Sequence, residues 1–238
     1  MPADLPPVKR IRWSHAYRIV PSRFPPVGLY DRIADPADLD AVFAIEALTN
    51  PRLREEAGAL RLVPPEHRLS GPGSTPVMAA FTHLNPEGSR FSDGSWGVFY
   101  AAHSVVTAVE ETVYHRERFL AATAEPACDI EMRCYCTRVD SRLHDIRGGW
   151  KNEHDPDVYM ASVKLARVLR EAGSNGIVYD SVRHHGGECV AAFQPDVVGP
   201  CVQAKHYIYR WDGTRIAAVL EVAAVARRGV RADASGDV

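Results

Sequence analysis

Apolar and polar residues alternate most regularly between positions 128 and 137, a pattern typical of a strand with one solvent-facing side. A mixture of both types over 11–20 predicts another strand, which the prolines between 21 and 26 end. The same reasoning predicts strands over residues 76–82, 96–102, 176–182, 188–193 and 202–211. Short connections between the last of these favour antiparallel pairing.

Helix signals occur at three places. Asp35-Pro36 and Asp155-Pro156 each put an N-cap residue before a proline suited to the first helical turn. They predict helices from 36 to 49 and from 156 to the glycine at 173. Ser104 can cap a third helix, which continues to about residue 120 and carries an apolar stripe of valines. Glu111 lies on another face of this helix, so it is not expected in the core.

The composition is that of an ordinary globular protein. Because 46% of the 238 residues are hydrophobic and 24% are charged, we expect one domain over 1–238. Residues 1–10 are expected to be an extended N-terminus, and 228–238 a frayed tail. The net charge of −2 excludes a general positive field for nucleic acid or an anionic membrane. Apolar runs are too short to span a bilayer, and the first ten residues lack a secretory pattern, so we expect a cytoplasmic protein.

The cysteines and histidines favour neither disulfides nor a metal site. The five cysteines are odd in number and include only one C-x-C pair, so they are expected to be reduced core thiols. Of the ten histidines, His184 and His185 are adjacent and cannot project like a metal-binding helix pair. Phosphate-loop, dinucleotide-binding and nucleophile-elbow motifs are also missing.

Four blocks of sequence carry a family resemblance. Arg18 lies in AYRIV, Arg90 and Tyr100 lie in GSRFSDGSWGVFYAA, Glu111 lies in TAVEETVYH, and Ser181 lies in SNGIVYDSVRHHGGECVAAF. Each block alone is weak evidence. Together and in this order they resemble the RES family, which is named for its Arg, Glu and Ser residues. The longer stretch between the two arginines resembles a longer branch of that family.

The resemblance implies an α+β fold similar to ADP-ribosyltransferases, in which small, mainly antiparallel sheets flanked by helices form a cleft for NAD⁺. It also implies a toxin of a bacterial type II toxin–antitoxin system. NAD⁺ would be the substrate, with no metal required. The implied partner is a cognate antitoxin with a helix-turn-helix (Xre-like) part, which covers the active site.

The resemblance also assigns roles to residues. Glu111 would stabilise positive charge on the ribose as nicotinamide leaves, with Glu110 as the second choice. Arg18 and Arg90 would bind the diphosphate or orient the nicotinamide ribose, with Arg90 also taking part in catalysis. Tyr100 and Ser181 would contact the ligand. Without the resemblance, the charged residues would be interpreted as solvent-exposed or ion-paired side chains. Tyr100 would be interpreted as a core aromatic, and Ser181 as a strand-end hydroxyl bonded to the backbone.

Several functions remain open at this point. Family members transfer ADP-ribose to a protein or destroy NAD⁺ by phosphorolysis or hydrolysis. We expect protein ADP-ribosylation, because the segment between Arg18 and Arg90 could dock a macromolecule; Arg52 in it is a possible phosphate ligand. The rivals are a non-catalytic nucleotide-binding module and a ribonuclease with His184 or His185 as the general base.

Overall fold

The computed structural model describes residues 5–21, 31 and 59–223. Its seven strands form one mixed sheet in the order β1-β2-β5-β4-β3-β6-β7, and β1 also pairs with β3. The strands are β1 (Val8–Pro21), β2 (Phe99–Ala102), β3 (Cys128–Asp145), β4 (Gly176–Asp180), β5 (Glu188–Ala192), β6 (Val202–Trp211) and β7 (Ile216–Val222). All described pairings are antiparallel except that of β3 with β4.

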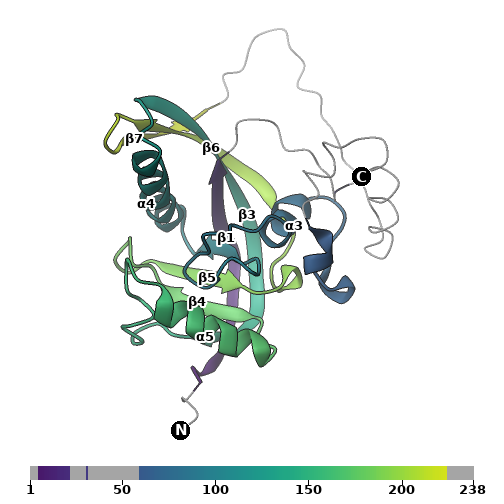
Figure 1. The fold of residues 1–238 in the computed structure, drawn as a ribbon. Coiled ribbons are helices and arrows are strands. Elements are labelled where there is room, and N and C mark those ends of the chain that lie inside the picture. The colour runs from purple at the N-terminus through teal and green to yellow at the C-terminus, as the bar shows by residue number, and fades with distance from the viewer. Residues whose placement is uncertain (1–4, 22–30, 32–58, 224–238) are drawn as a thin grey trace.

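The length of β3 explains how the sheet closes. One edge of this 18-residue strand pairs with β1, while the other edge pairs with β6 near its start and with β4 at its end. Since β1 also pairs with β2 through Tyr17 and Ala102, strands β1, β2, β5, β4 and β3 form a closed ring. The β6–β7 hairpin extends beyond this ring, as Figure 1 shows.

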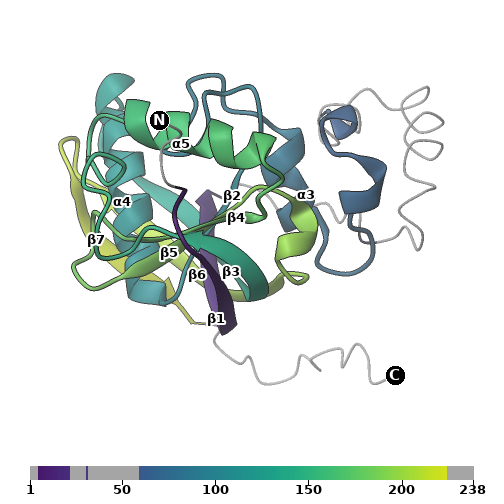
Figure 2. The same ribbon diagram turned by 90° about the horizontal axis from the view of Figure 1, so that it is seen from below.

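Two hydrophobic clusters occupy the two faces of the ring strands. Adjacent residues alternate between them, so Phe99 and Val190 belong to one cluster while Tyr100 and Ala191 pack in the other. The first cluster includes side chains of α3 (Thr75–Thr82), and the second includes side chains of α4 (Val105–Ala122) and α5 (Met160–Glu171). Helices α3 and α4 therefore lie on opposite sides of the strands (Figures 1 and 2). Short 3₁₀ turns occur at Leu60–Leu62, Pro65–His67 and Pro195–Val197.

The helix after Ser104 is confirmed with its cap. The Ser104 hydroxyl accepts a hydrogen bond from the backbone N–H of Thr107 at 3.1 Å. The helix then runs to Ala122, so Glu111 lies near its middle. This cap fixes where the helix begins and hence the direction in which the Glu111 side chain points.

The predicted strand over 76–82 is wrong, because these residues form helix α3. Val77, Met78 and Phe81 are buried, which is a helical spacing, but an apolar run this short does not by itself distinguish a helix from a buried strand. Asp31 stabilises the helix start, since its carboxylate accepts hydrogen bonds from the backbone N–H and hydroxyl of Thr75 at 3.1 and 2.7 Å. A cap supplied from more than forty residues away gives no local signal.

The predicted start of the helix at 156 is also wrong, since α5 begins at Met160. The Asp155 carboxylate does accept backbone N–H bonds, from Asp157 at 2.9 Å and Val158 at 2.7 Å. These bonds form a turn instead of a helix cap. Strand β7 was not predicted, and β3 continues eight residues beyond the expected end at 137.

The mixed α+β class is confirmed, although the described strands form one sheet and not several small ones. The extended N-terminus is partly structured, because β1 begins at Val8. The predicted helix over 36–49, Arg52 and the tail at 228–238 lie outside the described residues. Within the described residues, no helix is long and apolar enough to cross a membrane. The expectation of a single domain over 1–238 stays a prediction.

Candidate active site around Glu111 and Ser181

Glu111 and Ser181 meet across the fold. Glu111 projects from the middle of α4, and Ser181 directly follows the last residue of β4. The Ser181 hydroxyl donates a hydrogen bond to Oε1 of Glu111 at 2.6 Å. The serine is only 8% exposed, whereas Glu111 is half-buried. Two predicted site residues that are 70 positions apart in the sequence are thus in direct contact.

The turn after β4 fixes the direction of this hydrogen bond. The hydroxyl oxygen of Ser181 accepts the backbone N–H groups of Arg183 and His184 at 3.2 and 3.0 Å, so its proton is directed at the carboxylate. The turn is compact, because a Cβ on Gly187 would lie 2.7 Å from the Thr107 side chain. The Thr107 hydroxyl is itself 2.9 Å from Nδ1 of His184.

Arg90 is buried and is 7% exposed. It lies near the pair, because its charge and that of Glu111 both act on the pKa of Tyr179. Its Nη1 donates to the backbone carbonyls of Glu153 and Asp155 at 3.2 and 2.8 Å. The guanidinium also lies over the Tyr159 ring, 4.5 Å from its centroid. Arg90 therefore holds the segment that leads into α5, and all of these partners are neutral groups.

Arg183 is a second arginine of the site, and it was not among the site residues predicted from the sequence. It lies two residues after Ser181, inside the fourth family block, which is the signal that could have found it. Its guanidinium stacks on the Tyr114 ring of α4 and donates to the carbonyl of Pro156. Partial loss of water contact, together with the charges of Arg183 and other arginines, lowers the pKa of His115 to about 4.

Tyr100 closes the site from β2. Its hydroxyl lies 2.8 Å from the Ser89 hydroxyl and accepts the backbone N–H of Phe91 at 2.9 Å. Burial raises the pKa of Tyr100 to about 12, so the phenol stays neutral at physiological pH. Because Phe91 follows Arg90 directly, Tyr100 positions the backbone that carries this arginine.

Arg18 contacts only Tyr100 among the other predicted site residues. Its Nη1 donates to the backbone carbonyl of Tyr100 at 3.2 Å, and its guanidinium lies 4.8 Å from the centroid of the Phe99 ring. Burial lowers the pKa of Arg18. Among the described residues it forms no hydrogen bond or ion pair with Glu111, Ser181 or Arg90. Its predicted contact with NAD⁺ stays a prediction.

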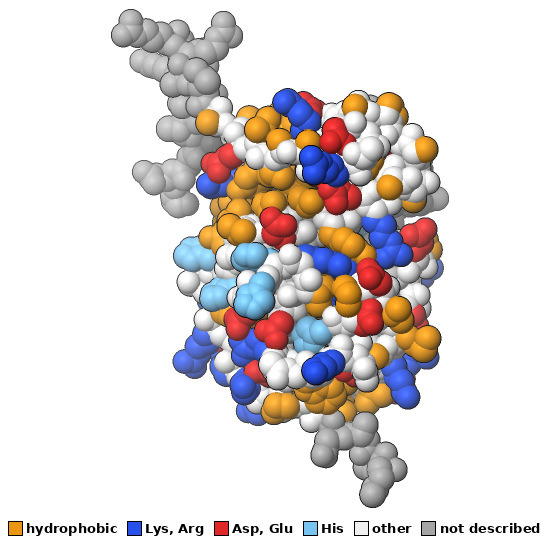
Figure 3. All heavy atoms as spheres, turned by 90° about the vertical axis from the view of Figure 1, so that its left-hand side faces the viewer, with side chains coloured by type: hydrophobic (Ala, Val, Ile, Leu, Met, Phe, Trp, Pro, Cys, Tyr) orange, Lys and Arg blue, Asp and Glu red, His pale blue; other side chains and the backbone are white. Residues whose placement is uncertain are grey.

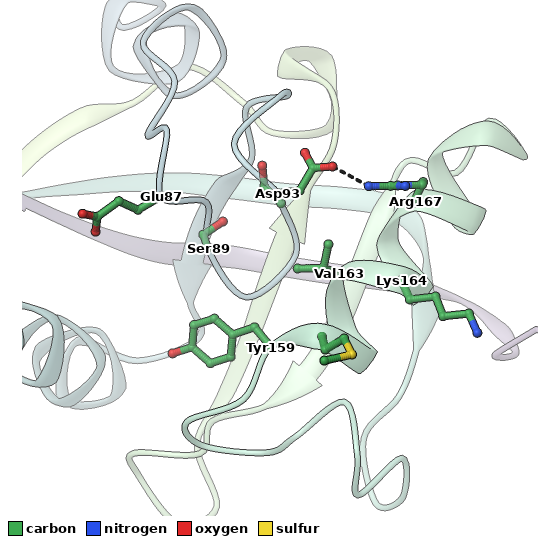
Figure 4. A pocket seen from close by; sticks show the side chains of 9 residues that line it. Glu87, Ser89, Asp93, Tyr159, Val163, Lys164 and Arg167 are labelled. Atoms are coloured by element: carbon green, nitrogen blue, oxygen red, sulfur yellow. Dashed lines mark hydrogen bonds and ion pairs between the residues drawn. The ribbon is translucent and has the colours of Figure 1, made fainter.

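An open pocket of about 410 Å³ adjoins the Arg90 end of the site. Figure 4 shows Ser89 and Tyr159 on its lining, which links it to the hydroxyl of Tyr100 and to the ring beneath Arg90. The ion pair of Asp93 and Arg167, at 2.6 Å, lies at its rim and also borders a second hollow of about 450 Å³. Glu111 and Ser181 do not line this pocket.

Among the residues that the structure describes, no cluster of three or more His, Cys, Asp or Glu side chains could hold a metal ion. All five cysteines are free thiols, but Cys128 is exposed and Cys136 half-buried, so the core placement holds only for Cys134, Cys189 and Cys201. The surface seen from the left of Figure 1, where α4 lies, carries histidine, acidic and basic side chains close together (Figure 3).

These features define an α+β protein with a carboxylate–hydroxyl pair flanked by buried arginines. The RES domain model matches residues 65–212, which include Arg90, Tyr100, Glu111 and Ser181 but not Arg18. The chain belongs to the RES family, which confirms the resemblance seen in the sequence.

Two proteins are similar to this chain over most of its length. The chain is 35% identical over 203 residues to "Uncharacterized protein y4oC" of Sinorhizobium fredii (strain NBRC 101917 / NGR234), and the match covers 84% of both chains. Among solved structures, the M. tuberculosis MbcT–MbcA toxin–antitoxin complex contains a chain with 12% identity and a TM-score of 0.39. That match covers 84% of this chain and 86% of the other.

Proposed function

We propose that this protein is the toxin of a bacterial toxin–antitoxin pair and that it breaks the bond between nicotinamide and ribose in NAD⁺. The observation that carries the proposal is the Glu111 carboxylate, held by the Ser181 hydroxyl at 2.6 Å beside the buried Arg90. Membership of the RES family supports the same substrate. The resemblance to ADP-ribosyltransferases that the sequence implies remains part of this proposal.

The reaction requires stabilisation of positive charge more than acid catalysis. When the N-glycosidic bond breaks, its electron pair stays on the ring nitrogen, and nicotinamide leaves as a neutral molecule. Positive charge then develops on the ribose, and a nearby carboxylate stabilises it. Glu111 would take this role and would also accept the proton of the attacking nucleophile.

The neighbours of Glu111 have supporting roles in this scheme. Ser181 hydrogen-bonds to one carboxylate oxygen, which orients the carboxylate and leaves the other oxygen available for ribose hydroxyls. Arg90 would bind the diphosphate, a task for which its forked donors are suited. Tyr100 would act by holding the Ser89–Phe91 backbone in place, through the two hydrogen bonds of its hydroxyl.

We further propose that the ADP-ribose acceptor is a protein, which would make the enzyme a mono-ADP-ribosyltransferase. Phosphate or water as the acceptor would instead make it an NAD⁺ phosphorylase or glycohydrolase. The cognate antitoxin, with its helix-turn-helix part, would cover the site. Co-expression of the neighbouring antitoxin gene should then suppress toxicity.

The first test measures nicotinamide release from NAD⁺ by the purified full chain and by a Glu111→Gln variant. Loss of a positioned catalytic group lowers rates by about 10²–10⁴-fold, so we expect a decrease of this size. Glu110→Gln is the matched control, because Glu110 is the adjacent carboxylate of α4 but is exposed. We expect this control to keep the wild-type rate.

Each alternative result has a definite meaning. Loss of release in Glu110→Gln but not in Glu111→Gln would transfer the catalytic role to Glu110. Release that depends on phosphate would favour phosphorolysis, while labelled NAD⁺ that marks a lysate protein would favour ADP-ribosylation. NAD⁺ binding without release under any condition would favour a non-catalytic nucleotide-binding module.

A further inference from the structure

Two arginines of the site, the buried Arg90 and the largely buried Arg183, have only weak compensation of their charge. Arg90 is 7% exposed, and its hydrogen-bond acceptors are the main-chain carbonyls of Glu153 and Asp155. No carboxylate among the described residues lies within ion-pair distance of its guanidinium, although its charge helps to lower the pKa of Asp155. Burial of an unpaired cation is costly, because carbonyl dipoles replace lost hydration less well than an anion does.

Arg183 is in a similar environment. Its side chain is 13% exposed, and its closest acceptor is the carbonyl of Pro156. Asp157 is 3.9 Å away but is itself 72% exposed, so solvent screens this contact strongly. The Nε–H of Arg183 is buried and has no hydrogen-bond partner in the described structure. This guanidinium therefore keeps donor capacity that the protein does not use.

The two arginines contact the same short segment. Arg90 bonds to the carbonyls of Glu153 and Asp155, and Arg183 bonds to that of Pro156. All three acceptors therefore lie within residues 153–156. Both arginines also lower the pKa of His115, so both charges lie within reach of this residue of α4. Arg183 is further tied to the catalytic pair, because its backbone N–H donates to the Ser181 hydroxyl at 3.2 Å.

We propose that Arg183 is a further substrate-binding residue, which together with Arg90 holds the diphosphate of NAD⁺. This inference rests on the proposed function and extends it to a residue outside the predicted set. A diphosphate carries several anionic oxygens and matches two forked guanidinium groups. When it binds, the arginines exchange the carbonyls of residues 153–156 for phosphate oxygens.

The surroundings of the segment allow this exchange to remain local. The backbone N–H of Gly148 donates to the Asp180 carboxylate at 2.7 Å, and the Asp180 N–H donates to Nε2 of His154 at 3.2 Å. These bonds tie the segment to the end of β4 without either arginine. The carbonyls of Glu153, Asp155 and Pro156 can therefore be released by the arginines while Gly148 and the His154 ring keep the segment attached next to Ser181.

The test is calorimetric titration of the full chain with ADP, a probe that carries the diphosphate but cannot react. Loss of a hydrogen bond to a charged group weakens binding by about tenfold to a hundredfold, and we expect this loss in Arg183→Gln. Arg183→Lys keeps the charge but not the fork, and we expect an intermediate affinity. Arg210→Gln is the control, because Arg210 is an exposed arginine paired with Asp129 on β3. Adenosine, which lacks phosphate, should bind equally to all variants.

Kinetics separate this inference from the proposed function. In Arg183→Gln we expect a raised KM for NAD⁺ with kcat nearly unchanged, whereas Glu111→Gln lowers kcat. If the wild-type chain releases nicotinamide but Arg183→Gln keeps wild-type ADP affinity, only the role of Arg183 is overturned. If the wild-type chain neither releases nicotinamide nor binds ADP, both proposals are overturned. Thermal unfolding of each variant shows whether a loss of binding comes from misfolding. An Arg183→Lys variant with the wild-type unfolding midpoint and the wild-type affinity for ADP would also contradict the role of Arg183 as a forked diphosphate ligand.

Discussion

Two arginine–carboxylate regions of this molecule are built in opposite ways. Asp145, at the end of β3, is buried. Its carboxylate accepts hydrogen bonds from Nε and Nη2 of Arg147, each at 2.9 Å, and forms an ion pair with Lys9 at 2.8 Å. Arg147 also pairs with Glu188 at 2.7 Å. In contrast, Glu111 receives a hydrogen bond from a neutral hydroxyl, and the neighbouring arginines are turned toward main-chain carbonyls.

The difference fits a structural role for the Asp145 region and the proposed catalytic role for the Glu111 region. In the Asp145 network every charge has a charged partner, and the network links β1, β3 and β5, so it stabilises the closed ring of strands. Around Glu111 the charges are held in position but remain incompletely paired. A site prepared in this way can form stronger bonds with a charged ligand than it makes within the protein.

The largest stability effect is expected for Asp145→Asn. The variant leaves Arg147 with fewer acceptors, and removal of one partner from a buried pair costs about 3 kcal/mol. The free energy of unfolding, measured by urea denaturation at pH 7, should fall by about this amount. Nicotinamide release by the folded fraction should stay unchanged, and a loss of activity without a loss of stability would contradict the separation of the two regions.

The pH dependence of this effect follows from the pKa of Asp145. Hydrogen bonds from Arg147 hold that pKa well below its usual value, so the carboxylate contributes stability above the unfolded pKa of about 3.9. As the pH falls from about 5 toward the folded-state pKa, this contribution is lost. The difference in unfolding free energy between wild type and Asp145→Asn should therefore shrink on acidification. A difference that grew at low pH would contradict the assignment.

A smaller change is expected for Ser181→Ala, and it should appear in activity instead. The variant removes the donor to Glu111, and a hydrogen bond to a charged group contributes about 1.5–3 kcal/mol, which corresponds to about 10–150-fold in rate. The loss should fall on kcat, because Ser181 orients Glu111 without being required for diphosphate binding. Affinity for ADP, measured by calorimetry, should stay near the wild-type value. Lower ADP affinity with an unchanged kcat would instead support the direct ligand contact that the sequence suggested for Ser181.

The elements that could be predicted from the sequence are those with local signals. Ser104 and the valine stripe mark α4, and strict alternation marks the first half of β3. The segment 76–82 was predicted as a strand because the residue that stabilises the start of this helix, Asp31, is distant in the sequence and gives no local signal. The helix predicted at 156 begins later because Asp155 forms a turn in front of it.

The site could be predicted only in part, for a related reason. No local pattern indicates that Glu111 and Ser181 meet, because the contact depends on how α4 packs beside the end of β4. The family blocks placed both residues at the NAD⁺ site, but they did not predict the contact between the two side chains. This is why Arg183, within a matched block, was not selected. The NAD⁺ contact predicted for Arg18 stays a prediction, since its described contacts reach the Tyr100 carbonyl but not Glu111 or Ser181.

The smallest effect on activity is expected for Arg18→Gln. Arg18 touches the Phe99 ring and the carbonyl of Tyr100, so it joins β1 to β2 on the face opposite to the Tyr100 hydroxyl. Loss of the cation–π contact should lower the free energy of unfolding by about 0.5–2 kcal/mol. The KM for NAD⁺ should change much less than in Arg90→Gln, where a buried guanidinium beside Glu111 is removed. Equal increases in KM for the two variants, with unchanged melting temperatures, would support the predicted contact of Arg18 with NAD⁺. That contact would require a structural change that brings Arg18 close to Glu111.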